Sequence, residues 1–234
     1  MTNAIIMASG MGVRMMPLTK NKPKPLIDVN GVPMIETVIS ALMNYGVKNI
    51  YIVVGYLKEQ FQYLKTKYSN IVIIENPDYM SINNISSLYY AVNYLKQDAC
   101  FICEADLYIA DQNILKSSSS CYYGKKVNGY SSDWVFDLDS NGYITRIGKG
   151  GKDLFNMVGI SYFNKMDSAL LSELIEARYN TEGFETLFWD DVVNENLDKL
   201  KLVITPIEQG QIFEIDTAEE LKRVRKKNLI KNGK

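Results

Sequence analysis

Residues 3–12, Asn-Ala-Ile-Ile-Met-Ala-Ser-Gly-Met-Gly, decide the fold that we expect for this chain. An apolar run over residues 3–8 ends at Ser9-Gly10, and Gly12 follows shortly after. The run predicts a strand covered on both faces, because its side chains are apolar throughout rather than alternating. A loop with two glycines directly after such a strand lets backbone N–H groups approach an anion closely. The stretch therefore predicts a ligand site at the end of a buried strand.

Later segments repeat this pattern of a short apolar strand beside a helix. Strands are expected at residues 49–54, 71–74 and 99–103. Helices are expected at residues 33–45, 57–68 and 84–95. Apolar strands that alternate with amphipathic helices are typical of a parallel sheet with helices on both faces. We therefore predict an α/β fold with a doubly wound, mostly parallel, Rossmann-like sheet.

The pattern changes after Asp106, and residues 117–165 hold shorter, mixed strands. Strands are expected at residues 134–138, 143–147, 157–163, 201–205 and 212–215, and helices at residues 166–179, 187–197 and 217–229. Asn141-Gly142 is a hairpin signal between two of these strands. We expect a single domain over residues 1–234, with a main part at about 1–116 and 200–234 and a small mixed α/β insertion at about 117–199.

The composition excludes several classes of function. Lys plus Arg total 26 and Asp plus Glu total 27, for a net charge of -1. Proteins that bind nucleic acid are usually strongly basic, so we expect no nucleic-acid partner. The chain has no histidine, which excludes Ser-His-Asp and Cys-His hydrolases and His-ligated metal sites. No apolar run is long enough to span a membrane, and we expect no membrane partner.

The cysteines point to a reducing compartment, and we expect a cytoplasmic protein. The chain holds Cys100, Cys103 and Cys121, a low and odd number. Cys100 and Cys103 lie three apart on an expected strand, so their side chains face opposite sides of the sheet. We expect buried, unreactive thiols rather than a disulfide or a shared metal site.

A local excess of positive charge follows the first strand. Residues 1–27 contain no acidic residue, but they include Arg14, Lys20, Lys22 and Lys24. Lys24 lies between two prolines, and we expect it on a stiff, extended segment because proline disfavours helix before it. The run matches neither Walker A nor the dinucleotide fingerprint, whose third glycine is absent. A glycine loop with these cations fits the phosphates of a nucleoside triphosphate.

The order of these residues resembles a known signature. The run is similar to that of the nucleotidyltransferases that join a nucleoside triphosphate to a phosphorylated small molecule, through Gly10-x-Gly12-x-Arg14, Pro17-Leu-Thr19 and Pro23-Lys24-Pro25-Leu26. Ser9 stands where that family usually has alanine. The likeness covers most of the chain, and it is greatest to the bacterial CTP:phosphocholine cytidylyltransferases, through residues 54–61, 83–89 and 188–190.

The resemblance implies a Mg²⁺-dependent transfer of CMP from CTP, with pyrophosphate leaving. The attacking phosphate or phosphonate oxygen is already an anion, so the reaction needs no general base, in agreement with the absence of histidine. Asp106 and Asp216 would hold Mg²⁺. Arg14 would neutralise the pyrophosphate and Lys24 the α-phosphate. The other implied nucleotide contacts are Ala8, Ser9, Gly10, Gly12, Asn84, Ser87 and Glu104.

The resemblance places the acceptor in the insertion, with Asp133, Trp134, Phe188 and Asp190 around a choline group. Aromatic faces and a carboxylate suit a quaternary ammonium, which has no N–H to donate. We therefore predict a CTP:phosphocholine cytidylyltransferase that makes CDP-choline. One alternative is 2-aminoethylphosphonate, whose primary amine needs several acceptors such as Asp133, Asp190 and Asp191. A sugar-1-phosphate nucleotidyltransferase and a non-catalytic nucleotide sensor are further alternatives. The expected partners are CTP and a small phospho- or phosphono-amine.

Overall fold

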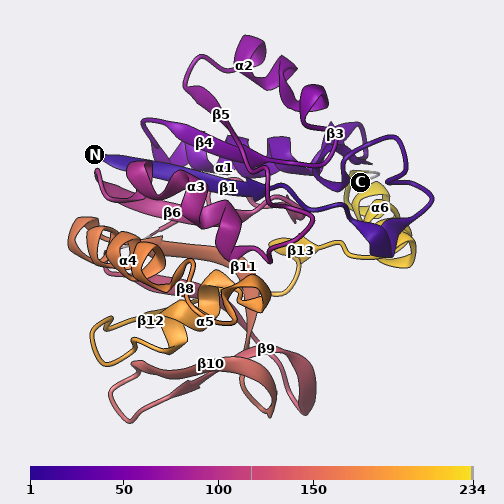
Figure 1. Ribbon diagram of the computed structural model, residues 1–234. Helices are drawn as coiled ribbons and strands as arrows, with labels where there is room; N and C mark the ends of the chain where they lie inside the picture. Colours follow the sequence, from indigo (N-terminus) through magenta and orange to yellow (C-terminus); the bar gives the residue numbers. More distant parts are fainter. Residues whose placement is uncertain (117, 233–234) are drawn as a thin grey trace.

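The computed structural model describes residues 1–116 and 118–232, with side chains described as far as residue 226. Its centre is a nine-stranded mixed sheet in the order β10-β9-β11-β6-β1-β4-β5, which β8 and β12 extend beside β11 (Figure 1). The parallel block at its core consists of β1 (Thr2–Ala8), β4 (Ile50–Val54), β5 (Ile71–Glu75) and β6 (Ala99–Glu104). The predicted α/β fold with a doubly wound, mostly parallel sheet is confirmed.

Helices cover both faces of the parallel block. α1 (Met34–Tyr45) packs on one face, and α3 (Ile85–Leu95) and α4 (Lys165–Arg178) pack on the other. Ile5 and Ile6 belong to the apolar clusters of opposite faces. Successive strand residues point to opposite sides, which is why a doubly covered strand is apolar at every position. In the described part of the chain, no helix combines the length and apolarity that crossing a membrane requires.

The cysteines follow the same alternation. Cys100 and Cys103 belong to the apolar clusters on opposite faces of β6. Both thiols are free and buried, as is that of Cys121. The prediction of buried thiols without a disulfide is confirmed.

The insertion continues the main sheet. β11 (Phe155–Phe163) pairs antiparallel with β6. The other strands of the insertion join the sheet through β11, since β8 and β9 pair with it directly. They are β8 (Cys121–Lys126), β9 (Tyr130–Leu138), β10 (Ile144–Lys152) and β12 (Val203–Pro206), with α5 (Trp189–Asn194) packed on β10. Gly142, with φ 85°, closes the turn between β9 and β10 and confirms the predicted hairpin.

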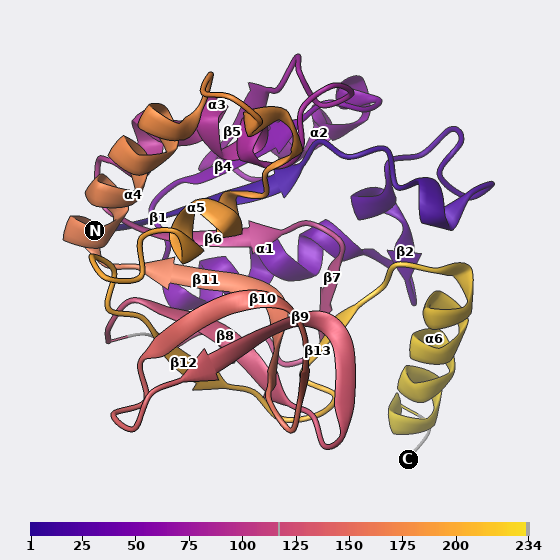
Figure 2. The ribbon, with the colours of Figure 1, turned by 60° about the horizontal axis from the view of Figure 1, so that its bottom comes forward.

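The C-terminal segment returns to the N-terminal part of the chain. β13 (Ile212–Glu214) pairs antiparallel with β7 (Leu107–Ile109). α6 (Ala218–Asn232) then packs against β2 (Asp28–Val29), which pairs with β3 (Val32–Pro33), as Figure 2 shows. The pairing of β13 with β7 places the residues after β13 beside those after β6.

Three sequence predictions of local structure are wrong in detail. The helix expected at 57–68 is a 3₁₀ turn, Lys58–Phe61, followed by the short α2 (Tyr63–Lys67), and Leu57 lies outside it with a left-handed φ of 49°. The helix expected at 187–197 is limited to α5, and turns follow it. Lys24 does not lie on an extended segment.

The segment around Lys24 is instead a 3₁₀ turn, Lys24–Leu26. Leu26 N–H donates to Pro23 O at 3.0 Å, and Ile27 N–H donates to Lys24 O at 3.1 Å. These two hydrogen bonds outweigh the preference of a residue before proline for extended backbone. The turn is short and proline-braced, so it still fixes the position of the lysine.

Candidate active site

A cleft of about 990 Å³ opens where β1 and β6 end. This is the edge at which open parallel sheets bind their ligands. Nearly all of the residues predicted from the sequence line it: Ala8, Ser9, Gly10, Gly12, Arg14, Lys24, Asn84, Ser87, Glu104, Asp106, Asp133, Trp134, Phe188 and Asp216. Asp190 does not line it, and neither does Asp191, whose Oδ2 accepts a hydrogen bond of 2.8 Å from Phe188 N–H.

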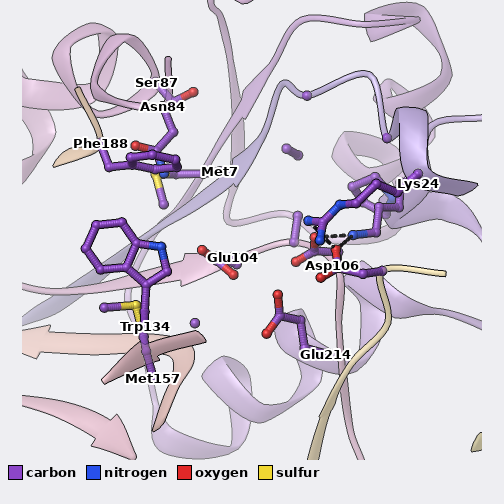
Figure 3. Close-up of a pocket in the computed structure, with 18 of the residues that line it drawn as sticks. Met7, Lys24, Asn84, Ser87, Glu104, Asp106, Trp134, Met157, Phe188 and Glu214 are labelled. Atoms are coloured by element: carbon purple, nitrogen blue, oxygen red, sulfur yellow. Dashed lines mark hydrogen bonds and ion pairs between the residues drawn. The ribbon is translucent and has the colours of Figure 1, made fainter. Parts of the chain in front are cut away.

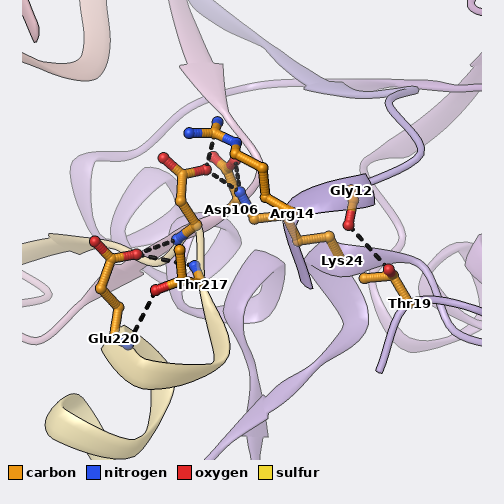
Figure 4. A network of polar contacts seen from close by, with 8 residues as sticks. Gly12, Arg14, Thr19, Lys24, Asp106, Thr217 and Glu220 are labelled. Carbon is orange, nitrogen blue, oxygen red and sulfur yellow. Dashed lines mark hydrogen bonds and ion pairs between the residues drawn. The ribbon is translucent and has the colours of Figure 1, made fainter. Parts of the chain in front are cut away.

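One lysine joins three distant parts of the chain at one end of this cleft. Lys24 Nζ lies 2.6 Å from Asp106 Oδ2 and 2.5 Å from Asp216 Oδ1. Arg14 Nη2 reaches the same Asp216 oxygen at 2.7 Å. The Lys24 side chain is only 9% exposed, whereas that of Arg14 is 68% exposed. The cationic loop and the two distant acids therefore meet in one place (Figure 4).

The charges of this corner depend on one another. Burial alone would lower the pKa of Lys24, but the carboxylates of Asp106 and Asp216 outweigh it and hold that pKa above its usual value. Burial would raise the pKa of Asp216, but Lys24 in particular holds it below its usual value. Lys24 is thus a permanent cation and Asp216 a permanent anion near neutral pH.

The loop before Lys24 is shaped by Gly12. Gly12 has a left-handed φ of 61°, and a Cβ there would lie 2.8 Å from Lys24 Cβ, so a larger residue would displace the lysine. Thr19 Oγ1 donates to Gly12 O at 2.9 Å and closes the loop. The backbone N–H groups of Gly10 and Gly12 donate no hydrogen bond to any described residue, which leaves them available to an anion.

The position of Asp216 is fixed by the start of α6. Glu220 Oε2 accepts hydrogen bonds from the backbone N–H groups of Asp216 and Thr217 at 2.8 and 2.9 Å. Thr217 Oγ1 accepts from Glu220 N–H at 3.2 Å, which completes a capping box. Figure 4 shows this cap directly beneath the ion pairs. The end of the helix therefore holds one carboxylate of the site in place.

Two further carboxyl groups lie near the ion pairs. Burial, together with Asp106, raises the pKa of Glu104 well above its usual value. Burial, Asp106 and Asp216 raise the pKa of Glu214 to about 8. Like charges within a recessed cleft disfavour ionisation of both groups. Burial and the neighbouring carboxylates therefore favour the uncharged form of both groups.

A buried hydroxyl network lies on the opposite side of the first loop. Ser9 and Ser87 share a hydrogen bond of 2.7 Å between their hydroxyl groups, and Asn76 Nδ2 donates to Ser87 Oγ at 3.2 Å. The Ser87 hydroxyl is therefore already engaged by the protein. Ser9, which replaces the usual alanine, ties the loop to α3. Asn84 Oδ1 accepts from Trp189 N–H at 3.0 Å, which leaves its Nδ2 donor to face the cleft.

The far end of the cleft is aromatic. The rings of Trp134 and Phe188 meet edge to face, with centroids 5.3 Å apart. Lys149 Nζ lies 5.8 Å from the Trp134 centroid and 5.7 Å from that of Phe188. Met7 and Met157 complete this apolar surface, and Figure 3 shows it across the cleft from Lys24 and Asp106.

The structure places Asp190 outside the lining of the cleft. Its side chain is buried, and its Oδ1 accepts a hydrogen bond of 2.9 Å from the Tyr122 hydroxyl. Burial raises the pKa of Asp190 to about 7. Asp190 therefore faces Tyr122 in the core rather than the cleft, and the acceptor contact expected for it stays a prediction.

Several lining residues were missed from the sequence. Glu214 lies two residues before Asp216, and the alternation of a strand would have placed both side chains on one face. Met7, Met157 and Lys149 carry no comparable signal, because isolated methionines and lysines on strands are ordinary. Met7 lies near the end of β1, whereas the pairing of β9, β10 and β11 brings Lys149 and Met157 to the cleft.

The fold and the cleft together define a nucleotidyltransferase. The MobA-like NTP transferase domain family matches residues 4–129, more than half of the chain. The chain belongs to this family. Its similarity to individual relatives further identifies it as a cytidylyltransferase.

Curated relatives and a solved structure match nearly the whole chain. It is 56% identical to the 2-aminoethylphosphonate cytidylyltransferase of Lancefieldella rimae, over 94% of this chain and 90% of the relative. It is 31% identical to the choline-phosphate cytidylyltransferase of Streptococcus pneumoniae, over 98% of both chains. The solved structure of the CTP:phosphocholine cytidylyltransferase of S. pneumoniae superposes with a TM-score of 0.90 at 30% identity, covering 97% of this chain and 99% of that one.

The ion pairs predict a large effect of removing Lys24. We expect Lys24→Ala to reduce turnover by about 100-fold, because its charge would act where negative charge develops. Steady-state pyrophosphate release measures this effect. Lys22→Ala is the matched control, since Lys22 belongs to the same segment but pairs with Asp28 outside the cleft. Equal losses in the two variants would contradict a specific role for Lys24.

The buried Asp190 predicts a pH-dependent stability. Its pKa is about 7 in the folded protein and 3.8 for the free side chain, so the folded state binds the extra proton between these values. Stability should therefore fall as pH rises through this window, by up to about 1.4 kcal/mol per pH unit from this group. Asp190→Asn should remove that dependence, as followed by denaturant unfolding between pH 5 and 8.

The control for this measurement is Asp198→Asn, which changes an exposed carboxylate. Its unfolding free energy should track that of the unmodified protein at every pH. A constant difference between Asp190→Asn and the unmodified protein from pH 5 to 8 would show that Asp190 does not carry the raised pKa.

Proposed function

We propose that the protein transfers the cytidylyl group of CTP to 2-aminoethylphosphonate. A phosphonate oxygen of the acceptor attacks the α-phosphorus of CTP, a new P–O–P linkage forms, and the bond to the β-phosphate breaks to release pyrophosphate. The 56% identity to the 2-aminoethylphosphonate cytidylyltransferase of L. rimae carries this proposal. It favours the phosphonate acceptor over phosphocholine, whose enzyme in S. pneumoniae is 31% identical.

The aromatic end of the cleft supports the same choice. A quaternary ammonium is recognised chiefly through the faces of aromatic rings. Here the ammonium group of Lys149 already lies near both Trp134 and Phe188. A trimethylammonium group at this place would meet a like charge, whereas a primary amine can use carboxylates elsewhere in the cleft.

The residues present fit a magnesium ion bound with the triphosphate. Asp106 Oδ1 is buried and has no hydrogen-bond partner among the described residues. These residues form no group of three or more acidic or sulfur ligands, but Mg²⁺ commonly takes one or two protein carboxylates together with phosphate oxygens and water. Asp106 and Asp216 would hold the ion, which would neutralise charge on the triphosphate.

The roles of the remaining residues follow from their places in the cleft. The free N–H groups of Gly10 and Gly12 would bind the β- and γ-phosphates, and the exposed Arg14 would neutralise the departing pyrophosphate. Lys24, held rigidly at the cleft floor, would face the α-phosphate. The Nδ2 donor of Asn84 would contact the cytosine or ribose. Catalysis then consists of positioning and charge neutralisation, without a general base.

The proposal predicts which substrates are used. Purified protein with Mg²⁺ should release pyrophosphate fastest from CTP with 2-aminoethylphosphonate. CTP with phosphocholine, CTP with glucose-1-phosphate, and each other nucleoside triphosphate with 2-aminoethylphosphonate are the comparison reactions. The identity of the product is checked by mass spectrometry. A higher kcat/KM with phosphocholine would overturn the assignment of the acceptor but not the class of enzyme.

The unpaired oxygen of Asp106 predicts a metal dependence. Chelation with EDTA should abolish turnover, and Mg²⁺ should restore it. Asp106→Asn should raise the Mg²⁺ concentration for half-maximal rate by about 10-fold or more, because it removes a charged ligand. Asp111→Asn, a change of the same kind beyond β7 and outside the cleft, serves as control. An unaltered Mg²⁺ requirement in Asp106→Asn would exclude Asp106 as a ligand.

A further inference from the structure

Glu104 is a recessed carboxyl group that the protein itself leaves unpaired. It is the last residue of β6, and its side chain stands in the cleft between the aromatic pair and the Lys24 corner (Figure 3). Its carboxyl oxygens make no hydrogen bond or ion pair with any described residue. The side chain is half-buried and lines the cleft, so a ligand bound there can pair with its carboxyl oxygens.

The fold makes room for this carboxyl group. The pairing of β11 with β8 is interrupted between Met157 and Ser161, and Gly159 within this irregularity has a left-handed φ of 72°. A Cβ at Gly159 would lie 2.8 Å from Glu104 Oε2. The backbone of β11 therefore approaches the carboxyl group as closely as glycine alone permits. This close packing holds the Glu104 side chain in the cleft.

None of the described lysines that line the cleft pairs with Glu104. Lys24 Nζ bonds to Asp106 and Asp216 rather than to Glu104. Lys149 lies over the aromatic pair, and Lys125 lines the cleft without an ion pair to any described residue. A cationic ligand could therefore provide a partner that the described residues do not provide. A primary ammonium suits the place, because it brings both a charge and three N–H donors, whereas a quaternary ammonium brings no donor.

We propose that Glu104 binds the ammonium group of the acceptor. This inference rests on the proposed function, and it replaces the nucleotide contact that the sequence resemblance implied for Glu104. The acceptor's phosphonate must lie near Lys24 and Asp106, where the α-phosphate would be attacked. Glu104 is two residues from Asp106, and a two-carbon chain separates the phosphonate from the amine. One short molecule can thus reach both places.

The test separates recognition of the amine from all other effects. Glu104→Gln keeps the size of the side chain but removes its charge. We expect the KM for 2-aminoethylphosphonate to rise about 10- to 100-fold, the range for losing one charge-assisted hydrogen bond, while the KM for CTP stays within about twofold. Ethylphosphonate, which lacks the amine, should be a poor acceptor for the unmodified protein. The preference for 2-aminoethylphosphonate over ethylphosphonate should largely disappear in Glu104→Gln.

Two further variants serve as controls for the loss of charge at Glu104. Glu104→Asp keeps the charge and should retain more affinity for 2-aminoethylphosphonate than Glu104→Gln does. Glu75→Gln makes the same chemical change in an exposed residue that pairs with Lys58 outside the cleft, and it should leave both KM values unchanged. Thermal unfolding followed by circular dichroism verifies that each variant is folded.

Several results would overturn the inference. A rise in the KM for CTP or in the Mg²⁺ requirement of Glu104→Gln, with an unchanged KM for the acceptor, would assign Glu104 to the nucleotide or the metal. Equal losses with 2-aminoethylphosphonate and ethylphosphonate would show that the amine is not what Glu104 recognises. If the unmodified protein does not use 2-aminoethylphosphonate, both proposals fail. If it does but Glu104→Gln binds this acceptor normally, only the present inference fails.

Discussion

The contact of the Lys24 ammonium group with two carboxylates is the interaction on which the site depends. It joins residues separated by 82 and 192 positions in the sequence. Breaking a buried ion pair by removing one partner typically costs about 3–5 kcal/mol, because the other charge is left uncompensated. An arrangement of the chain that separates Lys24 from Asp106 and Asp216 but leaves any of these groups buried carries this penalty. The first loop, the end of β6 and the start of α6 are therefore tied to one another through the active site.

The rest of the fold can be understood as support for that contact. Gly12 has no Cβ and so leaves room for the Lys24 side chain, and the pairing of β7 with β13 brings Asp216 beside Asp106. The capping box of α6 then fixes the backbone of Asp216. None of these supports contributes a reacting group. Rigid placement matters here because a reaction without a general base depends on where charges and substrates are held.

The sequence predicted the parallel core and the lining of the cleft around Lys24 well, and the lining at the aromatic end less well. The strands of the core are apolar at each position, and the glycines and cations after β1 form one continuous motif, so both signals are local. Asp190 was misplaced because only the docking of α5 onto β10 decides that its side chain turns toward Tyr122. Lys149 was missed for a similar reason, since its approach to Trp134 depends on the pairing of β9 with β10.

The uneven placement of charge along the cleft bears on the proposed choice of acceptor. One end has paired carboxylates and cations suited to phosphates, and the other has an aromatic pair that already faces a lysine. Glu104 lies between them without a partner, against the backbone of Gly159. An acceptor gains most if its anionic group lies at the first end and its cation reaches only as far as Glu104. A short phosphono-amine meets this condition, whereas a bulky quaternary ammonium would have to extend toward the charge of Lys149.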